Sequence, residues 1–332
     1  MRETVKQYNN LTIQQFNIPL YCGKFIIFAS SMEFYSHGKI MLSGEYAVLY
    51  GATCFALPTK LGQKMQVTFT PSEEQHCIQW HSYDSSMNEW YFAEIQLPHF
   101  FVTQTNSNDV SIQLFRFLKN AQVLNPDFLQ EKGVYVVNNY LEFDKEDGFG
   151  SSSTLTNNIA LWADVNPFSL HFNAFKGSGF DVAVALNGQP LLYTMNGNQP
   201  LVEIVNWQKN FTDKLYFVYL NKKQISRNQL TAIKHPIDKT QIAQISNISK
   251  LIAANDDYYE FCLMLELAES ETSRLLNRPT IKQELFPDFK GSIKSLGAWG
   301  GDYILATGDN TENYFKQKGF HKIYTYQELI KE

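Results

Sequence analysis

The stretch that most constrains this sequence is residues 147–154, where two glycines separated by one residue are followed by four consecutive hydroxyl side chains. Apolar residues at helical spacing come next, so we predict that a helix begins directly after the glycines. Glycine tolerates positive φ and close backbone approach, so this turn can point successive N–H groups at an anion. The start of the helix adds unpaired N–H groups and the positive end of its dipole. The stretch therefore predicts a phosphate-binding loop, although a serine-rich loop that only caps a helix has the same composition.

The composition is that of a folded protein with a sizeable hydrophobic core. Of the 332 residues, 44% are hydrophobic and 18% are charged, a balance typical of globular chains. The net charge of −5 and the lack of a long basic run argue against a surface for nucleic acid or for acidic membranes. No apolar run reaches the roughly 18 to 20 residues of a transmembrane helix. The four cysteines are scattered, without a C-x-x-C pair, which predicts neither disulfides nor a zinc site and favours a cytoplasmic location.

Short strand-like and helix-like segments alternate irregularly along the chain, which predicts an α+β protein. Residues 63–69 alternate apolar and polar side chains like a half-buried strand, and residues 111–123 have one apolar helical face. The pattern loosens over residues 196–207, where we place the boundary between two halves. We expect residues 1–32 to be an extension, loosely attached or upstream of the true start, because Met32 could itself be an initiator.

Three further segments combine glycines with charged residues. Residues 38–51 begin Gly-Lys and continue to Gly-Glu, residues 177–183 place Gly-Ser-Gly before Asp181, and residues 294–302 are rich in glycine. With residues 147–154, these segments resemble the superfamily of galactokinase, homoserine kinase, mevalonate kinase and phosphomevalonate kinase (GHMP kinases), and are most similar to its mevalonate-pathway members. The resemblance implies a two-domain GHMP kinase fold. Its N-terminal ribosomal protein S5 domain 2-like half would span residues 33–205, and its C-terminal ferredoxin-like half residues 206–332.

Asp181 and Lys39 are the candidate catalytic residues. A carboxylate that follows a flexible turn could orient an attacking hydroxyl and accept its proton, although an aspartate there could also be an ordinary helix cap. An ammonium beside it would keep the carboxylate ionised and neutralise charge on the transferred phosphoryl group. Lysines in strands are usually solvated, and it is the resemblance that implies both catalytic roles.

For the phosphate loop, the resemblance implies that backbone N–H groups bind the phosphates of ATP. The residues concerned are Gly148, Gly150, Ser151, Ser152 and Ser153. Ser152 corresponds to a serine that binds Mg²⁺ in the superfamily, so ATP and Mg²⁺ are the expected cofactors. The interval over residues 153–177 is shorter than usual and omits the helix that carries a second, acidic metal ligand in mevalonate kinase. We therefore assign no such ligand.

The resemblance also implies residues near the substrate, namely Glu45, Tyr46, Ser178, Gly179, Arg227, Gly297, Ala298, Gly300 and Gly301. The glycines of residues 297–301 would allow backbone contact with phosphates or acceptor, but a tight hairpin turn has the same composition. Arg227 could bind a carboxylate or phosphate through two hydrogen bonds, although a surface arginine after a strand is common. Glu45 and Tyr46 could equally be polar residues at the edge of a strand.

Several positions depart from the superfamily pattern. Residues 146–147 are Glu-Asp where members commonly have a proline, and residues 153–154 are Ser-Thr where alanine is common after the two serines. Trp299 stands where glycine is usual, and its bulk could narrow the site or reject the usual acceptor.

Together these features predict a cytoplasmic, ATP-dependent kinase of the mevalonate pathway. It would act on a small-molecule substrate, mevalonate or phosphomevalonate, as a monomer or homodimer, with no nucleic-acid or membrane partner. Two alternatives stay open: a sugar kinase of the same superfamily, and a non-catalytic member that keeps the fold as a ligand-binding or regulatory protein. ATP turnover with a panel of acceptors discriminates among the three.

Overall fold

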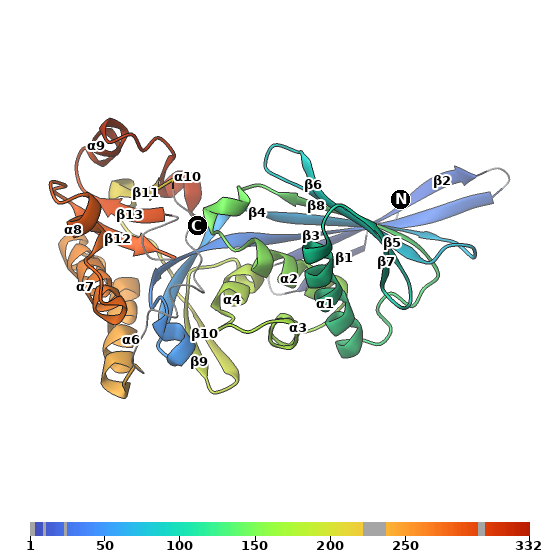
Figure 1. The fold of residues 1–332 in the computed structure, drawn as a ribbon, viewed down its shortest axis with the longest axis horizontal. Helices are drawn as coiled ribbons and strands as arrows, with labels where there is room; N and C mark the ends of the chain where they lie inside the picture. Colours follow the sequence, from blue (N-terminus) through green and yellow to red (C-terminus); the bar gives the residue numbers. More distant parts are fainter. Residues whose placement is uncertain (1–3, 9–10, 23–24, 222–236, 298–302) are drawn as a thin grey trace.

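The computed structural model describes residues 4–8, 11–22, 25–221, 237–297 and 303–332. Within these ranges the chain forms two β-sheets, a large one built from the N-terminal part of the chain and a small one built from the C-terminal part (Figure 1). Helices pack against both sheets, which confirms the predicted α+β class.

The large sheet has the strand order β1-β2-β3-β4-β8-β5-β6-β7, with β9 paired to β4 and β10 paired to β9. All neighbours are antiparallel except β5 and β8, which are parallel. The strands are β1 (Thr4–Tyr8), β2 (Leu11–Cys22), β3 (Phe25–Ser43), β4 (Cys54–Pro71), β5 (Cys77–Tyr83), β6 (Glu89–Gln96), β7 (Phe101–Thr105), β8 (Gly133–Leu141), β9 (Leu191–Asn196) and β10 (Gln199–Ile204).

Four helices cover one face of the large sheet (Figure 1). They are α1 (Asn108–Leu124), α2 (Ser151–Trp162), α3 (Pro167–Ala174) and α4 (Phe180–Asn187). Along β8 every second residue is buried, the alternation expected where one sheet face packs on helices. Two short 3₁₀ helices, η1 (Ala47–Tyr50) and η2 (Lys145–Asp147), lie in the connections before β4 and before α2.

The small sheet is antiparallel, in the order β12-β13-β11-β14. Its strands are β11 (Leu215–Tyr219), β12 (Ser292–Leu296), β13 (Tyr303–Thr307) and β14 (Ile323–Thr325). Its helices are α6 (Lys239–Ala254), α7 (Tyr258–Leu276), α8 (Ile281–Leu285), α9 (Thr311–Gln317) and α10 (Tyr326–Leu329), and the 3₁₀ helix η3 (Thr212–Lys214) leads into β11.

One hydrophobic cluster joins the two sheets. It contains Ile40 and Phe55 from the large sheet together with Phe217 and Leu305 from the small sheet and Phe261 from α7. A second cluster lies between the large sheet and helices α1 to α3. Because burial of apolar surface drives folding, the shared cluster holds the two sheets in contact and fixes the surfaces that meet between them.

Some predicted features differ from the structure in position. Strand β3 crosses residue 32 without interruption, so a regular strand spans the position at which we expected the extension to end. The loosened pattern over residues 196–207 contains β10, which pairs with β9 in a hairpin. The status of residues 1–32 and the division into halves at residue 205 stay predictions. Among the described residues, no helix is both long and apolar enough to cross a membrane.

Candidate active site

The predicted phosphate loop lies where β8 and η2 lead into α2. Gly148 and Gly150 both have positive φ, 69° and 90°, and Gly150 is the residue that precedes α2. A Cβ atom added to Gly150 would lie 2.7 Å from the Ser153 Oγ and 3.3 Å from the Lys39 Cγ. Only glycine can adopt this φ and leave this space, so the backbone here approaches the side chain of Lys39 closely.

The serines of the loop have different partners. The Ser153 hydroxyl is buried and donates to the Gly150 carbonyl at 2.7 Å, and the Thr154 hydroxyl donates to the Gln63 side chain at 2.6 Å. Ser152 is exposed and lines a cavity at this end of α2. The first N–H groups of a helix have no acceptor within the helix. The backbone N–H groups of Ser153 and Thr154 donate to the Gly150 carbonyl, both at 3.0 Å, so Ser152 is the residue of this stretch that lines the cavity.

Lys39 lies directly against this loop. Its backbone N–H donates to the Phe149 carbonyl at 2.9 Å, and its Nζ donates to the Gly148 carbonyl at 2.7 Å. The pairing of β3 with β4 is irregular between His37 and Lys39, and such bulges redirect side chains near functional sites. The bulge explains how a strand lysine reaches the loop instead of solvent.

Asp181 lies in the first turn of α4, which follows Gly179 at a φ of 80°. Its Oδ1 accepts the backbone N–H of Val182 at 3.0 Å. Asp181, Lys39 and Ser152 all line one cavity of about 370 Å³, together with Ser178 and Gly297. The structure thus brings residues from four separate sequence segments to the same cavity wall.

The cavity has further lining residues that the sequence did not single out. These are Met41, Val48, Leu49, His171, Phe175, Lys176, Gly177 and Phe180. The Lys39 Nζ lies 5.6 Å from the centre of the Phe180 ring, within the range of a cation–π contact. The cavity therefore combines basic groups with an apolar wall.

His171 stands out among the additional residues. Its exposed fraction is 9%, and its Nε2 has no hydrogen-bond partner in the part of the chain that the structure describes. Burial lowers the pKa of His171, and the charge of Asp181 opposes that shift. A neutral imidazole with one unsatisfied nitrogen is available to a ligand as either donor or acceptor. No local sequence pattern predicts this position for His171, which lies in a helix that begins with Pro167.

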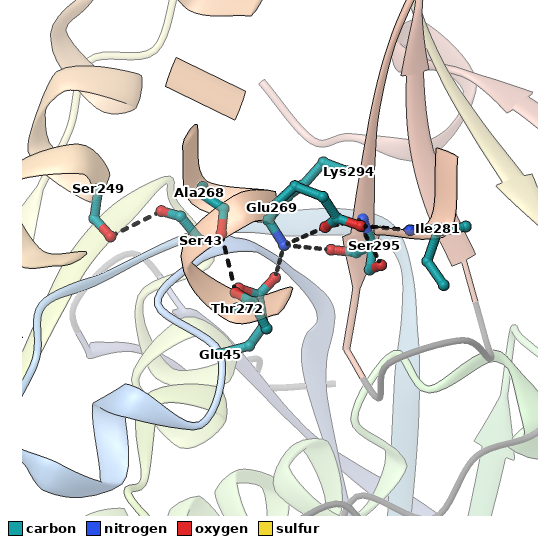
Figure 2. Close-up of polar contacts among 9 residues, drawn as sticks. All are labelled: Ser43, Glu45, Ser249, Ala268, Glu269, Thr272, Ile281, Lys294 and Ser295. Atoms are coloured by element: carbon teal, nitrogen blue, oxygen red, sulfur yellow. Dashed lines mark hydrogen bonds and ion pairs between the residues drawn. The ribbon is translucent and has the colours of Figure 1, made fainter. Parts of the chain in front are cut away.

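Glu45 is not the polar strand-edge residue that was one of its two expected roles. It is buried and forms an ion pair with the fully buried Lys294, whose Nζ lies 2.6 Å from Glu45 Oε1 and 3.6 Å from Glu269 Oε2. Figure 2 shows Lys294 between the two carboxylates. Burial raises the pKa of Glu45, and the ammonium of Lys294 opposes that rise. Glu45 also lines the cavity, so its position beside the site agrees with the prediction while its main partner is Lys294.

Glu269 extends this buried network. Its carboxylate accepts the backbone N–H of Ser295 at 2.9 Å, the Ser295 hydroxyl at 3.0 Å and the N–H of Ile281 at 3.2 Å (Figure 2). Ser295 precedes Gly297 by two residues, so the network fixes the end of β12 at the cavity. Buried carboxylates need this number of donors to offset lost hydration.

The structure describes some of the remaining candidate residues and not others. Tyr46 is buried at a φ of 62° and lines the cavity. Ser178 also lines it, and its carbonyl accepts the hydroxyl of Tyr193. Arg227, Ala298, Gly300 and Gly301, as well as Trp299, lie outside the described residues, and their roles stay predictions.

The described residues fit a nucleotide better than a free metal ion. No group of three or more His, Cys, Asp or Glu side chains could hold a metal among them. The exposed Ser152 hydroxyl and the Asp181 carboxylate supply oxygen ligands of the kind that Mg²⁺ prefers, and Mg²⁺ usually takes its other ligands from substrate phosphates and water. This arrangement suits a metal that arrives with a nucleotide.

Known proteins resemble this chain in fold but not in sequence. No family model matches the sequence, and no curated protein matches it significantly. Methanococcus jannaschii mevalonate kinase has a similar structure, with a TM-score of 0.62 at 15% identity over 88% of this chain and 96% of that chain. Streptococcus pneumoniae phosphomevalonate kinase, in complex with phosphomevalonate and AMPPNP, gives 0.60 at 16% identity over 86% and 95%.

Lactococcus lactis galactokinase, in complex with galactose, is similar to a comparable degree, with a TM-score of 0.59 at 13% identity over 87% of this chain and 88% of that chain. Similarity at such low identity is evidence of fold and not of a shared substrate. The chain therefore has the fold of the GHMP kinases, the superfamily to which mevalonate kinase, phosphomevalonate kinase and galactokinase belong.

Proposed function

We propose that this protein is a kinase that transfers the γ-phosphoryl group of Mg-ATP to a hydroxyl or phosphate group of a mevalonate-pathway intermediate, mevalonate or phosphomevalonate. The observation that carries the proposal is the convergence of Lys39, Ser152 and Asp181 on one cavity beside the glycine turn and the start of α2. Two of the structures with this fold are those of a mevalonate kinase and a phosphomevalonate kinase.

Each of the three residues has a distinct task in the proposed reaction. Bound Mg-ATP supplies the electrophilic phosphorus and ADP as the leaving group. Ser152 would ligate Mg²⁺, and N–H groups at the start of α2 would hold the phosphates. Asp181 accepts the proton of the acceptor hydroxyl as its oxygen bonds to the γ-phosphorus and the bond to the bridging oxygen of ADP breaks. Lys39 neutralises the charge on the phosphoryl group in transit.

The cavity suits a small acceptor that carries negative charge. Its volume of about 370 Å³ lies within the usual range for small-molecule sites. Lys39 and Lys176 line it along with the single carboxylate of Asp181 and the ion-paired Glu45. The basic groups favour an acceptor with a carboxylate or phosphate, while Phe175 and Phe180 provide an apolar wall for its carbon skeleton.

ADP release from Mg-ATP in the presence of mevalonate, phosphomevalonate or galactose tests the proposal. We expect turnover with one of the two mevalonate-pathway compounds. Turnover with galactose alone would instead assign a sugar kinase. Nucleotide binding without turnover of any acceptor would favour the non-catalytic alternative, and either result would contradict the proposed function.

A further inference from the structure

A buried acidic residue lies immediately before the phosphate loop. Asp147 ends η2, directly precedes Gly148 and has an exposed fraction of 2%. Its Oδ1 lies 2.5 Å from the Lys322 Nζ and accepts the Tyr303 hydroxyl at 3.1 Å, while its Oδ2 accepts the backbone N–H of Asp144 at 3.0 Å. A carboxylate beside a phosphate-binding loop repels the phosphates, because both carry negative charge. Phosphate binding by backbone N–H groups therefore does not explain the presence of Asp147.

The partners of Asp147 come from the small sheet. Tyr303 is the first residue of β13, and Lys322 directly precedes β14. The Tyr303 ring also stacks on Phe149, within the loop, with ring centres 5.1 Å apart. From the large sheet, the Lys39 Nζ donates to the Gly148 carbonyl and the Lys39 backbone N–H to the Phe149 carbonyl. Residues 147–149 thus contact strand β3 of the large sheet as well as Tyr303 and Lys322 from the small sheet.

The charge of Asp147 is matched locally. Lys322 pairs with both Asp147 and Asp144, at 2.5 and 2.9 Å, and these partners raise the pKa of its ammonium against the effect of burial. If this ammonium were absent, a buried carboxylate would face the phosphate-binding turn without compensation. Both the desolvation of that carboxylate and its repulsion of a bound polyphosphate would then be unfavourable.

We propose that Asp147 and Lys322 are positioning residues for nucleotide binding: the pair ties the start of the phosphate loop to the small sheet, and Lys322 offsets the charge of the Asp147 carboxylate beside the phosphates. This inference rests on the proposed function, since it assumes that the loop binds a nucleotide. It gives Lys322, which lies 175 residues from Asp147 in sequence, a part in a site built from distant segments.

The test is the affinity of Mg²⁺ with the non-hydrolysable analogue AMPPNP, measured by titration calorimetry at a temperature where circular dichroism shows each variant folded. We expect Lys322→Met to bind AMPPNP at least about tenfold more weakly than the wild type, because it leaves the Asp147 carboxylate without its counter-charge near the phosphates. The double variant Asp147→Asn with Lys322→Met should bind several-fold more tightly than Lys322→Met alone, because it removes that charge. In steady-state kinetics, the KM for ATP should rise more than the KM for the acceptor.

Asp288 provides a matched control, because its carboxylate also accepts from a tyrosine and a lysine, Tyr314 at 2.7 Å and Lys318 at 3.0 Å, but away from the loop. Asp288→Asn should leave AMPPNP affinity unchanged, whereas Asp147→Asn should weaken it a few-fold by releasing the loop. If Lys322→Met does not fold, the comparison of Asp147→Asn with Asp288→Asn still tests the inference. Equal affinities for Asp147→Asn and Asp288→Asn, or no recovery in the double variant, would overturn the inference. A wild-type protein that binds no nucleotide would instead refute the proposed function.

Discussion

His171 has a pKa that burial lowers from the ordinary value of 6.5, with only partial opposition from the charge of Asp181. The unfolded chain therefore binds a proton at a higher pH than the folded protein does. Stability that is present above pH 6.5 should be lost as the pH falls through that value toward the lower folded-state pKa. We expect His171→Phe to weaken this loss, measured as Tm between about pH 5 and 7.

A variant at an exposed histidine, His321→Phe, controls for the substitution itself and should keep the wild-type dependence of Tm on pH. If the Tm of His171→Phe fell with decreasing pH as steeply as that of the wild type, the imidazole would not be held neutral by burial.

At the residue scale, part of the site could be predicted because its signals are local. Lys39, Ser152 and Asp181 each stand in a short segment of glycines and polar residues, and all three line the cavity. The ion pair of Glu45 with Lys294 joins residues 249 positions apart, and no local pattern indicates such a partner. His171 was missed for the same reason, since its position in the cavity depends on how α3 packs beside Asp181.

At the scale of elements, the turn into α2 depends on Gly150. We expect Gly150→Ala to weaken AMPPNP binding about tenfold or more and to destabilise the fold by about 1–2 kcal/mol, because a side chain at positive φ is strained and the new Cβ would overlap Ser153. Calorimetric titration and urea unfolding measure the two effects.

Gly319→Ala is the matched control, because Gly319 has a φ of 88° but no atom within 4 Å of an added Cβ. It should show the smaller loss of stability that comes from the positive φ alone, without a loss of affinity. Equal nucleotide affinities for the two variants would show that the space at Gly150 does not matter to the loop.

The elements themselves were predicted where a periodic pattern was strong. The helices expected from the apolar spacing of residues 111–123 and after the glycine turn are present as α1 and α2, and the strand expected at residues 63–69 lies within β4. Helix α3 was missed, although Asn166 followed by Pro167 is a recognisable start: the Asn166 side chain caps the N–H of Ser169. Strand β10 is largely exposed, so its sequence lacks the buried face that makes a strand recognisable.

At the scale of the whole molecule, Lys294 joins the two halves, since it lies between Glu45, which follows β3, and Glu269 on α7. We expect Lys294→Met to lower the free energy of unfolding by about 3–5 kcal/mol, because it leaves the buried carboxylates of Glu45 and Glu269 without a counter-charge. Urea denaturation measures this change.

The exposed pair of Lys316 with Glu312, at 2.6 Å and four residues apart, gives the comparison. Lys316→Met should cost no more than about 0.5 kcal/mol, as for other exposed helical pairs. A loss below about 1 kcal/mol for Lys294→Met would mean that the buried network does not hold the halves together. That the halves share a core and this network could not be predicted, because it depends on contacts between residues far apart in sequence.

The most direct test of the kinase assignment compares wild type with Asp181→Asn for transfer of labelled γ-phosphate from Mg-ATP to mevalonate or phosphomevalonate. We predict labelled product from the wild type, and a loss of about 100-fold or more in kcat for the variant, with a Tm close to that of wild type. Transfer by Asp181→Asn within a few-fold of the wild-type rate would remove the carboxylate from the reaction and contradict the proposed mechanism.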